Sequence, residues 1–472
     1  MSLEKQSGKM WSGRFREPLD RTFEQWQRSF PFDWRLLPHE VAASQAHART
    51  IAAAGILTNA ELKAMLDGLS AIQPITSAAG STEAEDIHHF VELELTKKIG
   101  DLALKLHTGR SRNEQIATDM RLFVRDSIDN STDGLKRWAL ALLSLAESSD
   151  GKVMPSYTHL QRAEPVLVAH WLLTYVSMIE RDLSRFAAAR LRLNFCPLGS
   201  GAIAGATLAL DRRIPAKALN FSAPTANSMD ATSDRDFMLD FAQAASTLGL
   251  HISRFAEEIT LYATAEFGFV ELPEAFSTGS SAMPQKKNPD LTELARGKSA
   301  RLIGAATALA TLIKGLPLAY NKDLQEGQEQ IFDIADTLDG LLSVLPNFTN
   351  SLNFQFDRMQ TAAETGYLNA MAAATYLSNK GVPFRKAHEI VGNAVRLGLD
   401  KGLELNELPL ADLQQLSPAF ALDFFDAITV RATLDCHDVI GGTATARVSA
   451  ALADAKTRIV ALSPMLEVAA NG

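Results

Sequence analysis

The chain contains 472 residues, of which 46% are hydrophobic and 21% are charged, and its formal net charge is −9. This composition is that of an ordinary globular protein, and the length allows about two to four domains. The negative charge, without any basic tract, argues against a nucleic-acid-binding protein. The only cysteines, Cys196 and Cys436, exclude a disulfide framework and favour a reducing compartment.

Neither the N-terminus nor any apolar segment indicates secretion or a membrane. The polar residues 1–9 lack the apolar core of a signal peptide, and we expect them to be disordered. The longest apolar stretch, residues 165–179, is interrupted by His170 and is shorter than the roughly 20 residues that cross a bilayer. We therefore expect a soluble, cytoplasmic protein with no membrane partner.

Apolar residues spaced by three and four predict long helices. Such stripes run through residues 135–145, 237–262, 302–316 and 331–345. We expect the last two helices to end before Pro317 and Pro346. Residues 161–194 contain no glycine and one proline, Pro165, which predicts another very long helix. Alternating apolar runs are almost absent, so the expected fold class is mainly α.

The long stripes lie between residues 112 and 361 and predict an elongated central bundle packed like a left-handed coiled coil. Residues 1–111 and 362–472 have shorter helical patterns and more glycine and proline, which predicts two smaller helical end domains. Several bundle helices are rich in alanine and leucine around much of their circumference. We therefore expect the bundle to pack against other subunits in a closed, symmetric homo-oligomer.

Short polar segments interrupt these helical patterns. Thr108-Gly-Arg-Ser-Arg-Asn113 precedes a helical run that begins near Glu114. The helix amides, with Arg110 and Arg112, would bind a carboxylate, although a helix cap with two solvated arginines explains the residues equally well. In Tyr157-Thr-His-Leu-Gln-Arg-Ala-Glu-Pro165, His159 is a candidate general acid or base, or a structural histidine near a helix start.

The segment Cys196-Pro-Leu-Gly-Ser-Gly-Ala-Ile-Ala-Gly205 resembles a dinucleotide loop only superficially, because its spacing is wrong and we expect no strand before it. Close backbone packing or an anion nest is the better interpretation. The histidines and cysteines do not have zinc-ligand spacing, and His88-His89 is merely a pair. We expect no metal and no nucleotide cofactor.

Residues 277–290 form an irregular loop between two helical regions, with the sequence Ser-Thr-Gly-Ser-Ser-Ala-Met-Pro-Gln-Lys-Lys-Asn-Pro-Asp. Long structureless segments in compact helical proteins are usually active-site lids or disordered connectors. The hydroxyls and adjacent lysines of this loop suit closure over an anionic ligand. A solvated connector is the alternative.

The loop Gly279–Pro289 resembles the shared loop of the fumarase/aspartase superfamily, whose members eliminate fumarate from succinyl compounds. Within that superfamily the chain is similar to argininosuccinate lyases, in the segments Trp11–Phe15, Glu85–His88, Thr108–Asn113, Tyr157–Arg162, Pro197–Gly201, Tyr320–Glu326 and Pro383–Glu389. The resemblance covers essentially the whole chain. It implies the cleavage of argininosuccinate into arginine and fumarate by a homotetramer whose active sites lie at subunit junctions.

The resemblance also implies roles for the catalytic groups. Ser280 would take a proton from the succinyl carbon, and Lys286 with Asn288 suits stabilisation of the resulting carbanion. His159 would donate a proton to the leaving nitrogen, oriented by Glu293. The roles of Ser280 and His159 have been assigned both ways in this family. We favour Ser280 as the base, because the carbanion-stabilising groups share its loop.

The residues that the resemblance implies for substrate binding are Ser29, Arg112, Asn113, Thr158, Tyr320, Gln325 and Gln328. Tyr320 and Gln325 would bind the arginine end of the substrate, or else form a polar cap of the bundle. Gln328 stands where the family commonly has lysine, so it would bind a carboxylate through a hydrogen bond without a charge.

Two alternatives to this function remain open. The first is another fumarate-releasing lyase, such as adenylosuccinate lyase or fumarase, against which the loop Gln285-Lys-Lys287 argues. The second is a structural protein like the δ-crystallins, which share the fold and include a form without activity. Ser280 and His159 argue for a working enzyme.

Overall fold

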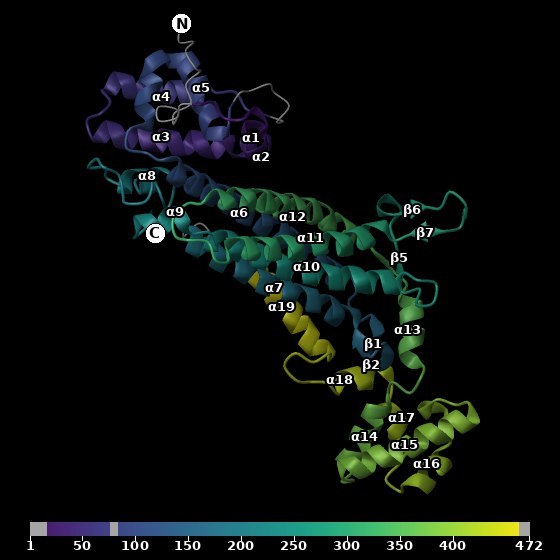
Figure 1. Ribbon diagram of the computed structural model, residues 1–472. Coiled ribbons are helices and arrows are strands. Elements are labelled where there is room, and N and C mark those ends of the chain that lie inside the picture. Colours follow the sequence, from purple (N-terminus) through teal and green to yellow (C-terminus); the bar gives the residue numbers. More distant parts are fainter. Residues whose placement is uncertain (1–16, 76–83, 462–472) are drawn as a thin grey trace. The chain divides into compact units, whose positions relative to one another are not determined.

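The computed structural model describes residues 17–75 and 84–461, and 68% of the chain is helical. The expected mainly α fold is confirmed. The expectation for residues 1–9 and the motif at residues 11–15 lie outside the described residues. The chain forms two compact units, shown in Figure 1: unit 1 comprises residues 17–75, 84–123, 194–234 and 315–329, and unit 2 comprises residues 124–193, 235–314 and 330–461.

Unit 1 is built mainly from short helices. They are α1 (Arg21–Trp26), α2 (Phe30–Asp33), α3 (Leu37–Ala53), α4 (Asn59–Ser70), α5 (Ile87–Ile99), α8 (Arg213–Ala218) and α9 (Ser228–Ser233), with the first turns of α6 (Arg112–Ser148) and α12 (Glu326–Asn350). Its only described strands, β3 (Phe195–Cys196) and β4 (Ala223–Pro224), form a two-residue parallel pair. Strand β3 corrects the expectation that no strand precedes the glycine-rich segment at residues 196–205.

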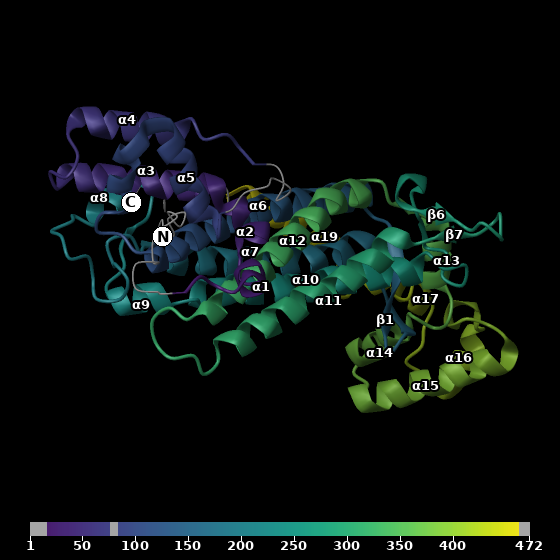
Figure 2. The ribbon, with the colours of Figure 1, turned by 45° about the horizontal axis from the view of Figure 1, so that its top comes forward.

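Unit 2 contains the predicted bundle. Its long helices α7 (Val168–Leu193), α10 (Asp236–Tyr262) and α11 (Asp290–Ile313) lie side by side with the remaining turns of α6 and α12, as Figures 1 and 2 show. Every residue of the predicted 237–262 stripe is buried, from Phe237 to Tyr262. Trp138 on α6 donates its indole N–H to the hydroxyl of Thr349 on α12 at 3.1 Å. The periodicity therefore identified the core face correctly.

The remaining elements of unit 2 are short. The strands are β1 (Val153–Thr158), β2 (Gln161–Leu167), β5 (Val270–Glu271), β6 (Thr278–Gly279), β7 (Lys287–Asn288) and β8 (Asn353–Phe354). The helices are α13 (Phe356–Glu364), α14 (Ala370–Asn379), α15 (Phe384–Lys401), α16 (Leu410–Leu416), α17 (Phe424–Ala427), α18 (Val430–Asp435) and α19 (Thr445–Ala461). Helices α14 to α17 share a separate apolar cluster around Leu377, Phe420 and Phe424.

Two helix predictions were wrong. Residues 161–167 are strand β2, which pairs antiparallel with β1, so the helix expected from residue 161 begins at Val168. Helix α12 does not end before Pro346 but continues to Asn350. Leu345 and Phe348 flank this proline and are fully buried, so we attribute the continuation to their packing, which offsets the roughly 3 kcal/mol cost of an internal proline. None of the described helices combines the length and apolarity that crossing a bilayer requires.

Candidate active site

A cavity of about 370 Å³ in unit 1 brings together most of the predicted substrate-binding residues. Six of the seven line it: Ser29, Arg112, Asn113, Tyr320, Gln325 and Gln328. They come from the start of α2, the start of α6 and the segment that leads into α12. These three parts of the chain are distant in sequence, so the cavity is a product of the tertiary fold. The seventh residue, Thr158, belongs to unit 2.

Local hydrogen bonds hold several of these side chains in place. Ser29 donates its hydroxyl to Asp33 Oδ2 at 2.6 Å. Gln325 donates its amide to the carbonyl oxygen of Gln27 at 3.1 Å, and Asn113 donates to the carbonyl oxygen of Ala202 at 3.2 Å. The cavity is therefore lined by polar groups that hydrogen bonds orient, as expected of a preformed ligand site.

Three carboxyl groups line this cavity that were not predicted as site residues, Asp33, Glu85 and Asp86. Asp86 accepts the backbone N–H of His89 at the start of α5, and its carboxylate lies 2.7 Å from Arg112 Nη1. Burial opposes ionisation of Asp86, but the charges of Arg112 and His88 and the backbone N–H of His89 together outweigh it and hold the pKa of Asp86 below its usual value. Burial, followed by the negative charge of Asp86, raises the pKa of Asp33 to about 7. The motif Glu85–His88 contained the signal for Asp86, whereas nothing in the sequence singled out Asp33.

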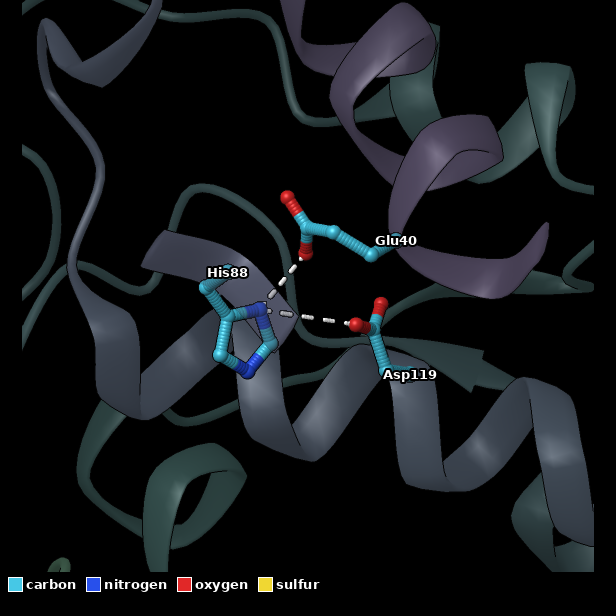
Figure 3. A group of neighbouring side chains, drawn as sticks. All are labelled: Glu40, His88 and Asp119. Carbon is cyan, nitrogen blue, oxygen red and sulfur yellow. Dashed lines mark hydrogen bonds and ion pairs between the residues drawn. The ribbon is translucent and has the colours of Figure 1, made fainter. Parts of the chain in front are cut away.

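His88, which also borders the cavity, lies in a buried cluster with Glu40 and Asp119 (Figure 3). Its Nδ1 is 2.7 Å from Glu40 and 3.6 Å from Asp119. Burial, and then the negative charge of Glu40, raises the pKa of Asp119 well above its usual value. Glu40 also accepts from Ser44 at 2.6 Å and Gln115 at 3.1 Å. These donors hold the Glu40 carboxylate in place, and Glu40 in turn orients the His88 ring through its contact with Nδ1.

The predicted anion site at the start of α6 is occupied by the chain's own carboxylate. Glu114 accepts the backbone N–H of Ser111 at 3.0 Å and that of Gly201 at 2.9 Å. Arg110 points instead to the Ser44 hydroxyl, at 2.8 Å. The close-packing interpretation of the glycine-rich segment is confirmed, because a Cβ at Gly201 would lie only 2.7 Å from the carbonyl oxygen of Gly205.

The predicted catalytic loop is a small hairpin in unit 2. Strands β6 and β7 pair Thr278 with Asn288, and Asn288 donates its amide to the Thr278 hydroxyl at 3.3 Å. Between the strands, Ser280 Oγ accepts the backbone N–H groups of Ala282 at 3.2 Å and Met283 at 3.1 Å. Two backbone amides therefore donate to the serine oxygen, and Lys286 belongs to the same loop.

His159 is at the tip of a second hairpin, formed by β1 and β2. Thr158 pairs with Gln161, so His159 and Leu160 are the two loop residues, and their φ angles are 56° and 58°. Such left-handed conformations cost roughly 1–3 kcal/mol each in residues other than glycine. The hairpin corrects the expectation that His159 lies near a helix start. Figures 1 and 2 both show this hairpin apart from the β6–β7 loop within unit 2.

Glu293, the predicted partner of His159, lies in the first turn of α11. Its carboxylate is half exposed and lies 4.0 Å from Arg296. Among the hydrogen bonds and ion pairs of the described residues, none joins Glu293 to His159 within the chain.

Comparison with known proteins assigns the chain to a family. Residues 13–304 match the Lyase family, and residues 367–435 match the family described as Argininosuccinate lyase C-terminal. The chain is 63% identical over 453 residues to the argininosuccinate lyase of Acidobacterium capsulatum, covering 94% of this chain and 93% of the relative. It is 53% identical to that of Koribacter versatilis, covering 98% and 100%. The chain belongs to the argininosuccinate lyase family.

Solved structures agree with this membership. EDDS lyase in complex with formate superposes with a TM-score of 0.82 at 26% identity, covering 92% of this chain and 88% of that one. The 3-carboxy-cis,cis-muconate lactonizing enzyme of Pseudomonas putida has a TM-score of 0.74 at 19% identity, covering 93% and 100%, and shares the fold alone. The family models and the curated relatives confirm the resemblance to argininosuccinate lyases, and the comparisons do not favour the two alternatives.

Proposed function

We propose that the protein cleaves argininosuccinate into L-arginine and fumarate, as a carbon–nitrogen lyase that works through a carbanion. Its membership of the argininosuccinate lyase family supports this reaction. The observation that carries the proposal is the cavity of unit 1, where six residues implied by the family resemblance line one space of about 370 Å³. Sequence similarity alone would not require these side chains to meet.

The loop of Ser280 suits the removal of a proton from the succinyl carbon. This step places a second negative charge on the neighbouring carboxylate, which then needs fixed cations and donors. Lys286 would supply the cation, and Asn288 would supply amide donors after leaving Thr278. The two backbone N–H groups at Ser280 Oγ would stabilise the serine alkoxide that acts as the base. Closure of the loop would exclude water from these charges.

His159 would then donate a proton to the departing guanidinium nitrogen, with Glu293 of another subunit orienting its ring. This arrangement requires the homotetramer implied by the family resemblance. Exposed apolar side chains on the bundle helices support such an assembly, among them Leu140, Leu191, Leu250, Leu294 and Ile303. Thr158, next to His159, would complete the substrate site from the same hairpin.

We also infer that the protein acts in the cytoplasm, since its two cysteines suit a reducing compartment. The division into domains 1–111, 112–361 and 362–472 stays a prediction. The reaction is tested by supplying argininosuccinate, adenylosuccinate and malate separately and recording fumarate by ultraviolet absorbance. Preferred turnover of adenylosuccinate or malate would overturn the assignment, and a purified protein that releases no fumarate from any of them would favour a structural role.

A further inference from the structure

We propose that Arg162 is a positioning residue for His159, because its guanidinium ties the strained turn that carries this histidine to the C-terminal end of α13. The inference rests on the proposed role of His159 in proton transfer. Arg162 lies at the base of the turn and bonds to α13, so we expect it to act through the histidine.

The contacts of Arg162 join two separate elements of unit 2. Arg162 lies opposite Tyr157 in the β1–β2 hairpin, next to the residue pair that closes the turn. Its Nη1 donates to the carbonyl oxygen of Ala362 at 3.2 Å and to the hydroxyl of Thr365 at 3.1 Å. Arg162 also donates a hydrogen bond to the Tyr157 hydroxyl. One guanidinium thus links both strands of the hairpin to the end of α13.

The end of α13 is a favourable place for this cation. Helix α13 ends at Glu364, so the carbonyl oxygen of Ala362 belongs to the last turn and has no partner within the helix. A positive charge there also complements the helix dipole. Nη1 alone bonds this carbonyl and the Thr365 hydroxyl, so the guanidinium keeps further donors for the Tyr157 hydroxyl, which a compact lysine ammonium would reach less well.

The turn itself needs such support. Two-residue hairpin loops with positive φ at both positions usually contain asparagine and glycine, whereas this one contains His159 and Leu160. Such conformations persist only where the surroundings impose them. A cavity of about 960 Å³, lined by Leu160, Gln161 and Arg162 among others, borders the hairpin. The turn therefore has room to relax when its tether is removed.

The ring of Tyr157 also packs against Phe267, with the ring centroids 5.5 Å apart. This contact holds strand β1, but it does not reach the two loop residues. Through its hydrogen bonds to Ala362 and Thr365, Arg162 connects the closing pairs of the turn to the end of α13. Its loss is expected to leave the hairpin folded and the position of the His159 ring undefined.

The test uses the full-length protein with Arg162→Ala and Arg162→Lys. Arg162→Ala should lower kcat for fumarate release by roughly 10- to 100-fold and change KM by less than about threefold, because proton donation and not binding is disturbed. Arg162→Lys should recover only part of the loss. The kcat–pH profile of Arg162→Ala should also lose or displace the limb that His159→Asn removes from the wild-type profile.

A change in the turn provides the matched control. Asparagine tolerates positive φ better than leucine does, so Leu160→Asn alone should have near wild-type activity. In the Arg162→Ala background, adding Leu160→Asn should raise kcat by at least about threefold over Arg162→Ala alone. A general defect in the packing of α13 would not respond to a substitution in the turn. Failure of this rescue, or a kcat within twofold of wild type in Arg162→Ala, would overturn the proposal.

Hydrogen exchange tests the same tether without activity. Backbone amides of residues 157–162 should exchange at least about tenfold faster in Arg162→Ala, whereas those of the bundle helices should not change. Equal exchange in the hairpin of the two proteins contradicts the tether. If the wild-type protein releases no fumarate, the proposed reaction fails, and the exchange measurement still decides whether Arg162 holds the turn.

Discussion

Ser280 Oγ accepts the backbone N–H of Met283 at 3.1 Å, within the loop that the sequence singled out. Donors at this distance stabilise an alkoxide more than a hydroxyl, so they lower the free energy of the ionised serine.

Replacement of Ser280 by alanine should therefore lower kcat by on the order of 10³, while KM changes little, because the hydroxyl acts mainly in the transition state. The neighbouring hydroxyl offers a matched control, and Ser281→Ala should keep kcat within about tenfold. Steady-state release of fumarate measures both variants. A kcat within a few-fold of wild type in Ser280→Ala would show that another group is the base.

Lys286 and Lys287 give a second matched pair. Lys286→Met should lower kcat by on the order of 10²- to 10³-fold, since a fixed cation beside the developing dianion is lost. Lys287→Met removes the same charge from the next residue and should cost less than about tenfold. A change confined to KM in Lys286→Met would assign this lysine to binding of the ground state alone.

Asp33 should make substrate binding depend on pH near neutrality. Its pKa is raised to about 7, so this carboxyl group is mostly protonated below that pH and ionised above it. Ionisation adds a negative charge to the cavity proposed to hold the cationic arginine end. We expect kcat/KM to rise as the pH increases through about 7, and we expect Asp33→Asn to flatten this limb. A limb that persists unchanged in Asp33→Asn would assign the titration to another group.

His47 should make unit 1 sensitive to acid. It is buried, its Nε2 lies 3.0 Å from the carbonyl oxygen of Thr108, and burial with the charge of Arg110 lowers its pKa to about 3. Because the unfolded value is about 6.5, its contribution to stability is complete above pH 6.5 and is lost as the pH falls towards 3. At pH 5 the loss amounts to roughly 2 kcal/mol.

The variant His47→Gln retains a side-chain donor but does not titrate. The free energy of unfolding, measured with urea at pH 7 and pH 5, should therefore fall less in His47→Gln than in the wild type, by about 2 kcal/mol. Equal pH dependence of the two proteins would mean that His47 does not control the acid response.

Helix α15 contains two glycines in contrasting environments. A Cβ at Gly398 would lie 2.6 Å from the carbonyl oxygen of Leu403, whereas a Cβ at Gly392 would meet no atom within 4 Å. Alanine favours a helix over glycine by up to about 1 kcal/mol, but overpacking costs about 1–3 kcal/mol. Gly398→Ala should thus lower the melting temperature, and Gly392→Ala should raise it slightly or leave it unchanged. The opposite order would contradict the packing at Gly398.

The sequence was most informative where a single physical pattern dominates. The stripe from Phe237 to Tyr262 extends over a whole helix, and its burial was predicted correctly. Residues 161–167 were wrongly predicted to be helical, because strand β2 depends on its pairing with β1. The turn at His159 and Leu160 contains no glycine or asparagine that would indicate a hairpin. Tertiary pairing decided that segment, and local composition did not reveal it.

The candidate site was predictable only through resemblance to a family. Periodicity does not place Ser29 beside Gln328, since three distant parts of the chain form the cavity. Asp33 was missed for the same reason, because its raised pKa depends on burial and on Asp86, which follows it by more than fifty positions. The cavity lining and the raised pKa of Asp33 both arise from the tertiary fold and not from local sequence.

The cavity of unit 1 contains neither Ser280 nor His159, so its walls can be redesigned without altering the atoms proposed to move protons. Gln328 is a natural starting point for such engineering, because its side chain lines the cavity and carries no charge. Libraries that vary this position and its neighbours offer a route to biocatalysts that add amines other than arginine to fumarate.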